Sequence, residues 1–149
     1  MPTLIIADTT CLVLLEKIGK LEILKNLYGK VTITSIISKE FKKIIPEWIE
    51  ITDPKNITLF NNLSTIVDIG EASAIALSKE KKDCILILDD LKARKLAMSL
   101  NLKYTGTIGV IIQAKKNGFI QDIDSIIEEI QKTNFRLSNI LIEKFKSFD

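Results

Sequence analysis

Short runs of β-branched, apolar residues alternate along this chain with segments of helical periodicity. The strand-like runs are TLIIAD at Thr3–Asp8, VTIT at Val31–Thr34 and CILILDD at Cys84–Asp90. Apolar runs of this length are typical of strands that are buried on both faces. Strands that alternate with helices predict a parallel sheet, because right-handed crossovers place the helices over its two faces. We therefore expect a three-layer α/β/α fold with a central parallel sheet of about four or five strands.

Weaker segments complete the expected pattern. WIEIT at residues 48–52 is a candidate edge strand, and LKYTGT at residues 102–107 is a further short strand. Helices are expected as a pair over residues 9–28 with a break at Gly19, over 35–46, 70–82, 91–100 and 108–116, and from Asp122 and Ser138 onward. No linker, repeat or low-complexity tract divides the 149 residues, so we expect 1–149 to be a single domain.

Composition excludes several kinds of chemistry. The chain has no histidine, which rules out Ser-His-Asp triads, histidine acid-base catalysis and most zinc sites. Cys11 and Cys84 both lie in apolar runs, so we expect buried free thiols rather than a disulfide. No apolar run approaches the ~18 uncharged residues of a membrane span, and the N-terminus lacks a basic signal region. We expect a cytoplasmic protein without membrane contact, in which any catalysis depends on carboxylates.

Acidic residues stand where the expected strands end. Asp8 ends the first strand, and Asp89 with Asp90 ends a later one. Parallel sheets bind their ligands at the carboxyl ends of the strands, so these acids are expected at one edge. Clustered carboxylates raise one another's pKa unless a cation lies among them, and Mg²⁺ or Mn²⁺ prefers such oxygen ligands. The pattern predicts a divalent-metal site that could activate a water for attack on a phosphodiester.

Each of these acids also has a purely structural explanation. Asp8 precedes Thr9 and Thr10 and could serve as a helix N-cap. Glu71 opens a helix, where a negative charge is stabilised by the helix dipole, and Glu40 lies in the charged segment SKEFKK, where it could be a solvated surface residue. Two successive acids exceed what one cap requires, so Asp89–Asp90 is the best local signal after Asp8.

Taken together, the four acidic positions form a recognisable set. Asp8 after the first strand, Glu40 in the helix after the second, Glu71 at a mid-chain helix start and Asp89 or Asp90 after the next strand resemble the PIN-domain ribonucleases, over almost the whole chain. The strings DIGEASAIAL, LILDDLKARKLA and GTIGVIIQAKKNG are similar to a branch of predicted nucleic-acid-binding PIN proteins related to the VapC toxins of toxin-antitoxin pairs.

The resemblance implies a metal-dependent endoribonuclease that hydrolyses RNA, with a toxin role and an antitoxin partner. It implies that the catalytic residues are Asp8, Glu40, Glu71 and Asp90, and that the ligands of Mg²⁺ or Mn²⁺ are Asp8, Glu71, Asp89 and Asp90. Spacing to the family pattern favours Asp90 over Asp89, although sequence alone does not separate these neighbours.

Three residues are predicted to contact nucleic acid. Lys92 and Arg94 follow the acid pair by one helical turn and are the best candidates for a phosphate contact. Some PIN enzymes carry further acids where this chain has Thr105 and Thr107 around Gly106, so a fuller second metal site is not expected there. The hydroxyl of Thr107 could instead orient a water or a phosphate.

Two other functions stay open at the level of sequence. The lack of extra acids around Thr107 is compatible with a catalytically weak PIN-like protein that binds nucleic acid or acts as an adaptor. Another small doubly wound domain, such as a phosphoacceptor receiver or a phosphatase-like fold, would also place acids at strand ends, but Asp8 lacks the neighbouring acids of such sites. Apolar positions in the C-terminal segment, among them Ile123, Ile127, Leu137 and Leu141, either close the core or dock a second copy, as in a homodimer, or an antitoxin helix.

Overall fold

A five-stranded parallel sheet forms the centre of residues 3–135, which are the residues that the computed structural model describes. Its strands are β1 (Leu4–Ala7), β2 (Val31–Ile33), β3 (Ile49–Ile51), β4 (Cys84–Ile87) and β5 (Lys103–Thr105). They are arranged in the order β3-β2-β1-β4-β5, and every neighbouring pair is parallel. The expected parallel sheet is confirmed, and the segment at residues 48–52 contributes an edge strand.

The order in which strands are added to the sheet switches sides once, and this switch point lies between β1 and β4. The chain builds outward from β1 through β2 to β3, and then returns to the other side of β1 to add β4 and β5. The ends of β1 and β4 are level, because Ala7 pairs with Ile87 and the Asp8 N–H donates to the Ile87 carbonyl at 3.2 Å. Such a switch point is where doubly wound sheets bind ligands.

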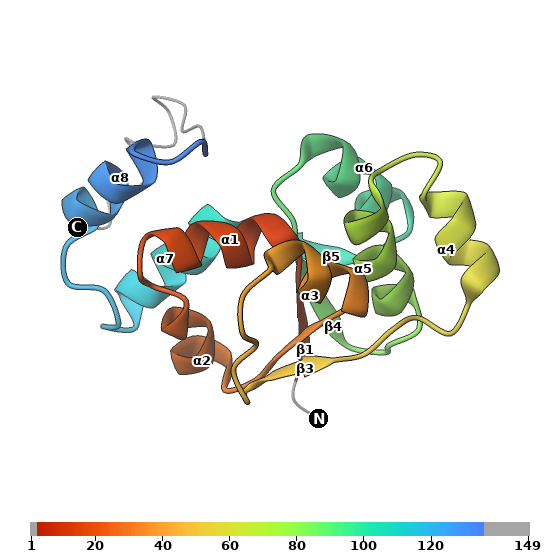
Figure 1. The fold of residues 1–149 in the computed structure, drawn as a ribbon, viewed down its shortest axis with the longest axis horizontal. Coiled ribbons are helices and arrows are strands. Elements are labelled where there is room, and N and C mark those ends of the chain that lie inside the picture. Colours follow the sequence, from red (N-terminus) through yellow and green to blue (C-terminus); the bar gives the residue numbers. More distant parts are fainter. Residues whose placement is uncertain (1–2, 136–149) are drawn as a thin grey trace.

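Helices cover both faces of the sheet (Figure 1). They are α1 (Thr9–Lys17), α2 (Glu22–Tyr28), α3 (Ser35–Phe41), α4 (Ile57–Leu63), α5 (Ile69–Lys79), α6 (Leu91–Ser99), α7 (Thr107–Lys116) and α8 (Ile123–Gln131). Helices α1, α2 and α7 lie on one side, and α4, α5 and α6 lie on the other (Figure 1). Helix α3 contacts both α1 and α5, so it joins the two sides beside the carboxyl ends of the strands. The three-layer arrangement is confirmed.

Several boundaries differ from the sequence expectation. The helix expected over residues 35–46 ends at Phe41, because Lys42 adopts a left-handed backbone with φ of 62°. Its N-cap is Thr34, whose side chain accepts a hydrogen bond from the Ile37 N–H. Helix α4 has no counterpart in the expectation. The helix expected from Ser138 and the apolar positions around it lie outside the described residues.

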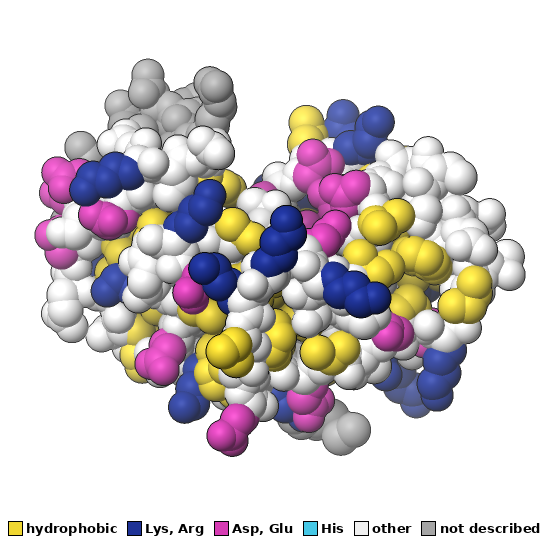
Figure 2. Space-filling view, viewed as in Figure 1, with side chains coloured by type: hydrophobic (Ala, Val, Ile, Leu, Met, Phe, Trp, Pro, Cys, Tyr) yellow, Lys and Arg dark blue, Asp and Glu magenta, His cyan; other side chains and the backbone are white. Residues whose placement is uncertain are grey.

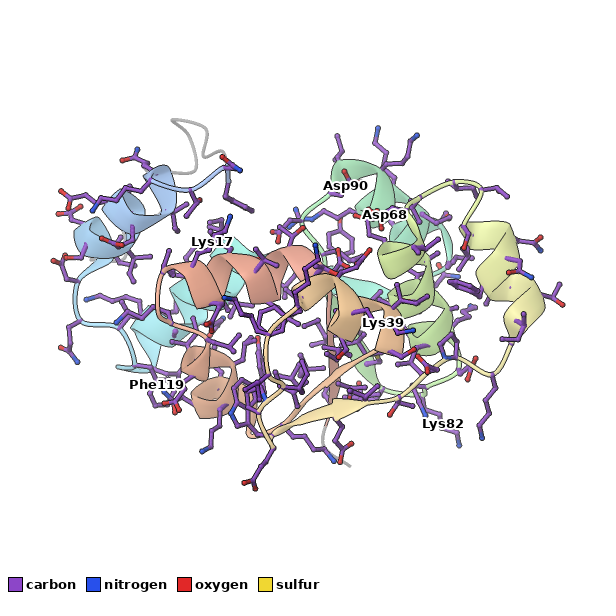
Figure 3. The ribbon with its side chains drawn as sticks, viewed as in Figure 1. Lys17, Lys39, Asp68, Lys82, Asp90 and Phe119 are labelled. Atoms are coloured by element: carbon purple, nitrogen blue, oxygen red, sulfur yellow. The ribbon has the colours of Figure 1, made fainter. Side chains whose placement is uncertain are left out.

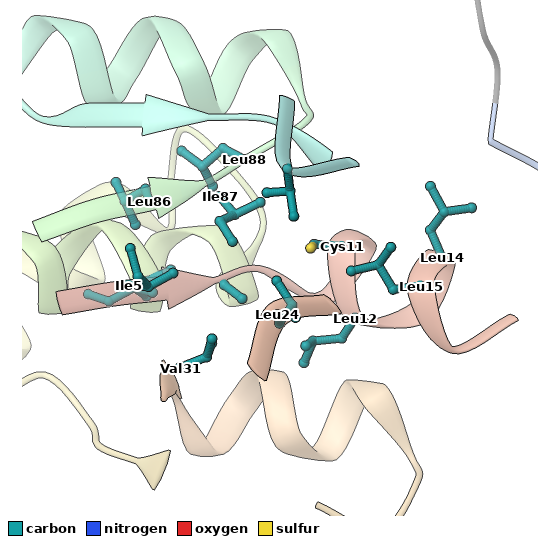
Figure 4. Packing of buried hydrophobic residues seen from close by; sticks show 14 of the residues in the cluster. Ile5, Cys11, Leu12, Leu14, Leu15, Leu24, Val31, Leu86, Ile87 and Leu88 are labelled. Carbon is teal, nitrogen blue, oxygen red and sulfur yellow. The ribbon is translucent and has the colours of Figure 1, made fainter. Parts of the chain in front are cut away.

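The core lies where the sheet meets its covering helices (Figure 4). Ile6, Leu86 and Ile87 on the two central strands are fully buried, as their continuous apolar runs predict. Cys11 and Cys84 are free thiols and both are buried, which confirms the expectation for them. Over residues 3–135, the helices are all too short or too polar to cross a membrane.

Candidate metal site at the carboxyl edge of the sheet

Acidic side chains from separate loops meet where the strands end. Asp8 connects β1 to α1, Asp89 and Asp90 connect β4 to α6, and Glu71 lies in the first turn of α5. Asp68 and Asp90 mark the starts of α5 and α6, and the surface is hollowed between this region and the part formed by α1 and α8 (Figures 2 and 3). The topology therefore brings together acids that are widely separated in sequence.

Asp8 is a buried carboxylate that the adjacent helix does not use. It occupies the N-cap position of α1, but its side chain makes no capping hydrogen bond, and only 4% of the residue is exposed. Burial is the main cause that raises the pKa of Asp8 from 3.8 to about 7. The Thr9 N–H opposes the rise, and the charges of Asp68, Glu40 and Asp89 contribute to it. A role in helix capping therefore does not explain this carboxylate.

Glu71 is the second buried acid of the cluster. Helix α5 is buried over most of its length, and Glu71 is 7% exposed. Burial, followed by the charges of Asp68, Asp8 and Asp90, raises its pKa from 4.5 to about 8. The charge of Asp8 is among those that raise the pKa of Glu71, so the two carboxylates belong to the same cluster.

Asp68 belongs to the cluster, although the sequence analysis did not select it. Its carboxylate caps α5 by accepting a hydrogen bond from the Glu71 N–H at 3.0 Å, which fixes the first turn of the helix. Its charge contributes to the raised pKa of both Asp8 and Glu71. An available signal was the spacing Asp68-x-x-Glu71, which resembles a capping box.

Glu40 reaches the cluster from α3. Although the residue is exposed, its carboxylate accepts a 2.6 Å hydrogen bond from the Thr9 hydroxyl at the start of α1. A Cβ atom at Gly70 would overlap with Oε1 of Glu40, so the absence of a side chain at Gly70 permits this close approach of α3 to α5. Glu40 is therefore held beside Asp8 and does not extend freely into solvent.

The two neighbouring acids Asp89 and Asp90 have different surroundings. Both carboxylate oxygens of Asp89 accept hydrogen bonds from Thr107, one from its N–H at 2.8 Å and one from its hydroxyl at 2.5 Å. Asp90 is exposed and caps α6 by accepting a 3.0 Å hydrogen bond from the Ala93 N–H. The charge of Asp89 acts on Asp8, and that of Asp90 acts on Glu71. Both acids therefore border the same cluster.

Arg94 lies beside Asp89 and is held in one orientation. Its Nε donates to the Leu88 carbonyl at 2.7 Å, and its guanidinium lies 5.3 Å from the centre of the Tyr104 ring. One terminal nitrogen is 4.0 Å from Asp89, and a Cβ at Gly106 would overlap with that nitrogen. Gly106 therefore permits the close packing of Arg94 against the end of β5.

The other two predicted nucleic-acid contacts differ sharply in exposure. Lys92 is exposed on α6, where it is accessible to a ligand. Thr107 is fully buried, and its hydroxyl is directed at Asp89. The structure thus places Thr107 behind the acid cluster, where it can orient Asp89 but does not face solvent.

The donor chemistry of the cluster fits a hard divalent cation. Within residues 3–135, no group of three or more acid or thiol side chains is already arranged to hold a metal ion. Mg²⁺ needs fewer protein ligands than that, because it commonly binds through one or two carboxylates and keeps several waters. Asp8 and Glu71 supply two buried carboxylates whose pKa values are raised mainly by burial and further by repulsion from neighbouring acids. A cation between them would relieve that repulsion.

The fold and the acid cluster define a doubly wound α/β domain with a carboxylate site at its topological switch point. A family model described as the PIN domain matches residues 4–148, so the chain belongs to the PIN-domain family. This is a family of nucleases that typically depend on divalent metals, and its fold is nuclease-type. Membership also implies a nucleic-acid substrate. Neither the curated proteins nor the solved structures include a significant match.

Proposed function

We propose that this protein is a metal-dependent endoribonuclease that hydrolyses phosphodiester bonds of RNA. The observation that carries the proposal is the pair of buried carboxylates, Asp8 and Glu71, at the carboxyl edge of the sheet. A buried acid is unfavourable unless its charge is compensated, and neither residue has a lysine or arginine partner among the described ion pairs. A carboxylate pair that awaits a cation is the feature a metal-dependent nuclease requires.

Mg²⁺ or Mn²⁺ would be held by Asp8 and Glu71, with Asp90 or Asp89 as a further ligand directly or through water. The bound cation supplies an activated water and neutralises charge on the phosphodiester. Asp68 fixes the turn that carries Glu71, and Thr9 fixes Glu40 at the border of the cluster. These contacts orient the carboxylates before substrate binds.

Arg94 and Lys92 are assigned to the phosphate backbone of the substrate. The Leu88 carbonyl and the Tyr104 ring hold Arg94 while its guanidinium keeps terminal N–H groups for a phosphate. Lys92 is two residues away on the exposed side of α6. Thr107 is assigned a positioning role, because its N–H and hydroxyl are both bonded to Asp89.

The biological role that we propose is that of a toxin restrained by an antitoxin in the cytoplasm. The supporting features are the resemblance of the middle segment to the VapC-related branch and the exposed apolar side chains beside the acids. Ile69 is 52% exposed and Leu91 is 66% exposed, next to Asp68 and Asp90 respectively. These side chains offer an apolar partner a place to cover the site.

A nucleic-acid-binding protein with weak or no catalysis is the second candidate. It is favoured by the absence, within the part of the chain that the structure describes, of three acids already arranged around a metal position. Under this alternative the protein binds RNA with or without metal and leaves it intact. Under the first proposal it cuts RNA only when Mg²⁺ or Mn²⁺ is present.

Metal-dependent cleavage of a single-stranded RNA by the purified protein tests the proposal. Activity is expected with Mg²⁺ or Mn²⁺ and is expected to disappear with a chelator. Glu71→Gln is expected to lower the rate by at least about 100-fold, since even groups that only support metal ligands cost about 10- to 100-fold. Asp83→Asn is the matched control, because Asp83 precedes β4 at the opposite edge of the sheet. Equal loss in both variants, or activity that survives the chelator, contradicts the proposal.

Asp89→Asn and Asp90→Asn are expected to separate the roles of the two neighbours. Asparagine caps helices as well as aspartate does, so Asp90→Asn should change the free energy of unfolding by less than about 0.5 kcal/mol while lowering cleavage. Asp89→Asn disturbs the two hydrogen bonds from Thr107 and should cost about 1–3 kcal/mol. Denaturant unfolding and cleavage assays measure both effects. Wild-type cleavage by Asp90→Asn would identify Asp89 as the ligand.

A further inference from the structure

A groove along α1 begins at the acid cluster and leads away from it. Its volume is about 310 Å³, and its lining residues are Thr9, Thr10, Val13, Leu14, Lys17, Thr133, Asn134 and Phe135. Thr9 belongs both to the groove and to the cluster, because its hydroxyl donates to Glu40 at 2.6 Å. Thr9 therefore connects one end of the groove to the border of the acid cluster.

The chemistry of the lining suits a single nucleic-acid strand. Among the described residues that line the groove, Lys17 is the one charged side chain, and it is a cation. Val13 and Leu14 supply an apolar floor, Phe135 supplies an aromatic ring, and Thr10 and Asn134 supply hydrogen-bonding groups. Single strands are bound by grooves that combine basic residues with aromatic rings on which bases stack.

Electrostatics give this groove a specific task. The acid cluster repels phosphate groups, so a strand that leads away from the site is favoured by a cation farther along its path. Lys17 lies on the α1 side of the hollow that separates α1 from the starts of α5 and α6 (Figures 2 and 3). From Thr9 to Lys17 the helix rises about 12 Å, which spans about three to four nucleotides stacked about 3.4 Å apart.

We propose that the α1 groove binds the nucleotides that flank the scissile phosphate on one side, with Lys17 on a phosphate and Phe135 against a base. The inference rests on the proposed ribonuclease function and adds to it the path of the substrate strand. It makes Lys17 and Phe135 substrate-binding residues at the opposite end of the groove from the metal ligands. Lys17 would attract any anionic chain, and the ring of Phe135, on which a base can stack, favours an RNA strand over an acidic peptide as the occupant.

The test of the groove measures binding of a short, labelled, single-stranded RNA to the full-length protein. All proteins carry Asp8→Asn, so that the RNA is bound but not cleaved. Lys17→Gln is expected to weaken binding several-fold and to lower the slope of log affinity against log salt by about 0.7, the value for one lost phosphate contact. Phe135→Leu keeps an apolar side chain but removes the ring, and it is expected to weaken binding about tenfold.

Two matched variants control for general effects of these changes. Lys20→Gln removes a lysine just beyond α1 and outside the groove lining, and Phe119→Leu removes an exposed aromatic ring beyond α7. Both should bind RNA as the Asp8→Asn parent does. If Lys17→Gln and Phe135→Leu match their controls in affinity and salt slope, the inference is overturned and the groove is left to a protein partner.

The same measurements separate this inference from the proposed function. RNA binding that depends on Lys17 and Phe135 supports the groove even if the wild-type protein proves unable to cut RNA, in which case only the ribonuclease proposal fails. If the wild type cleaves RNA in a metal-dependent way but RNA binding does not depend on either residue, only the inference about the groove is contradicted. Trimming the RNA from either end provides a second readout. Cleavage should fall when the RNA is shortened from one of its ends but not from the other, because the groove extends to one side of Thr9.

Discussion

The Asp8→Asn variant is expected to be more stable than the wild-type protein at about pH 8 without metal, and to have lost metal-dependent cleavage. Asparagine has the size of aspartate but carries no charge into this buried position, where 4% of the residue is exposed. A rise in the pKa of Asp8 from 3.8 to about 7 corresponds to about 4 kcal/mol of unfavourable free energy once the group is ionised. Recovery of about half of this would raise Tm by about 4–8 °C.

Thermal unfolding with a chelator present measures the effect, and the cleavage assay is run on the same preparations. Asp83→Asn again serves as the control, because Asp83 is an exposed acid whose carboxylate accepts a 3.0 Å hydrogen bond from Thr3. That variant should gain no stability and should retain activity. An Asp8→Asn protein that is less stable than wild type at this pH would show that the Asp8 carboxylate is not an uncompensated charge.

The metal-free wild-type protein is expected to lose stability as the pH rises from about 4 to about 8. Asp8 and Glu71 have raised pKa values of about 7 and about 8, so the folded state keeps protons that the unfolded state has already released. Wherever the folded state binds more protons, the free energy of unfolding falls with increasing pH. The favourable contribution is complete below about pH 4 and is lost as the pH passes the two folded-state values.

Denaturant titrations over this pH range, with and without Mg²⁺, measure the dependence. Saturation with metal at about 100 times its dissociation constant adds about 2.7 kcal/mol, and the addition should be largest where both carboxylates are ionised. In Asp8→Asn the loss of stability should be smaller and should be displaced toward the range in which Glu71 ionises. A wild-type profile that is flat between these pH values would contradict the buried cluster.

Most of the sheet and the positions of its terminal acids could be predicted from sequence. Runs such as TLIIA and CILIL are buried on both faces, so burial imposes a continuous apolar pattern that sequence displays directly. The carboxyl ends of parallel strands share one edge, so the placement of Asp8 near Asp89 and Asp90 followed from the fold class. Glu40 and Glu71 required the family resemblance, since their local sequence is also compatible with an ordinary helix surface or helix start.

Other features of the fold and the site could not be predicted from sequence, because they depend on contacts between residues that are distant in the chain. Helix α4 buries only Leu63, so it shows no apolar periodicity to detect. Thr107 was predicted to face nucleic acid, whereas the pairing of β4 with β5 turns its hydroxyl toward Asp89. Asp68 was hidden by its ordinary capping role, although the same carboxylate charge also reaches Asp8.

The central pairing of β1 with β4 has a consequence for biosynthesis. Thr3 and Asp83 meet across this pair although they are 80 residues apart, and Asp8 gains Asp89 as a neighbour only after the later strand has been made. Contacts between such distant segments form late in folding. A nascent chain that ends before Asp89 lacks part of the acid cluster. The acid cluster is therefore complete only after the ribosome has synthesised most of the domain.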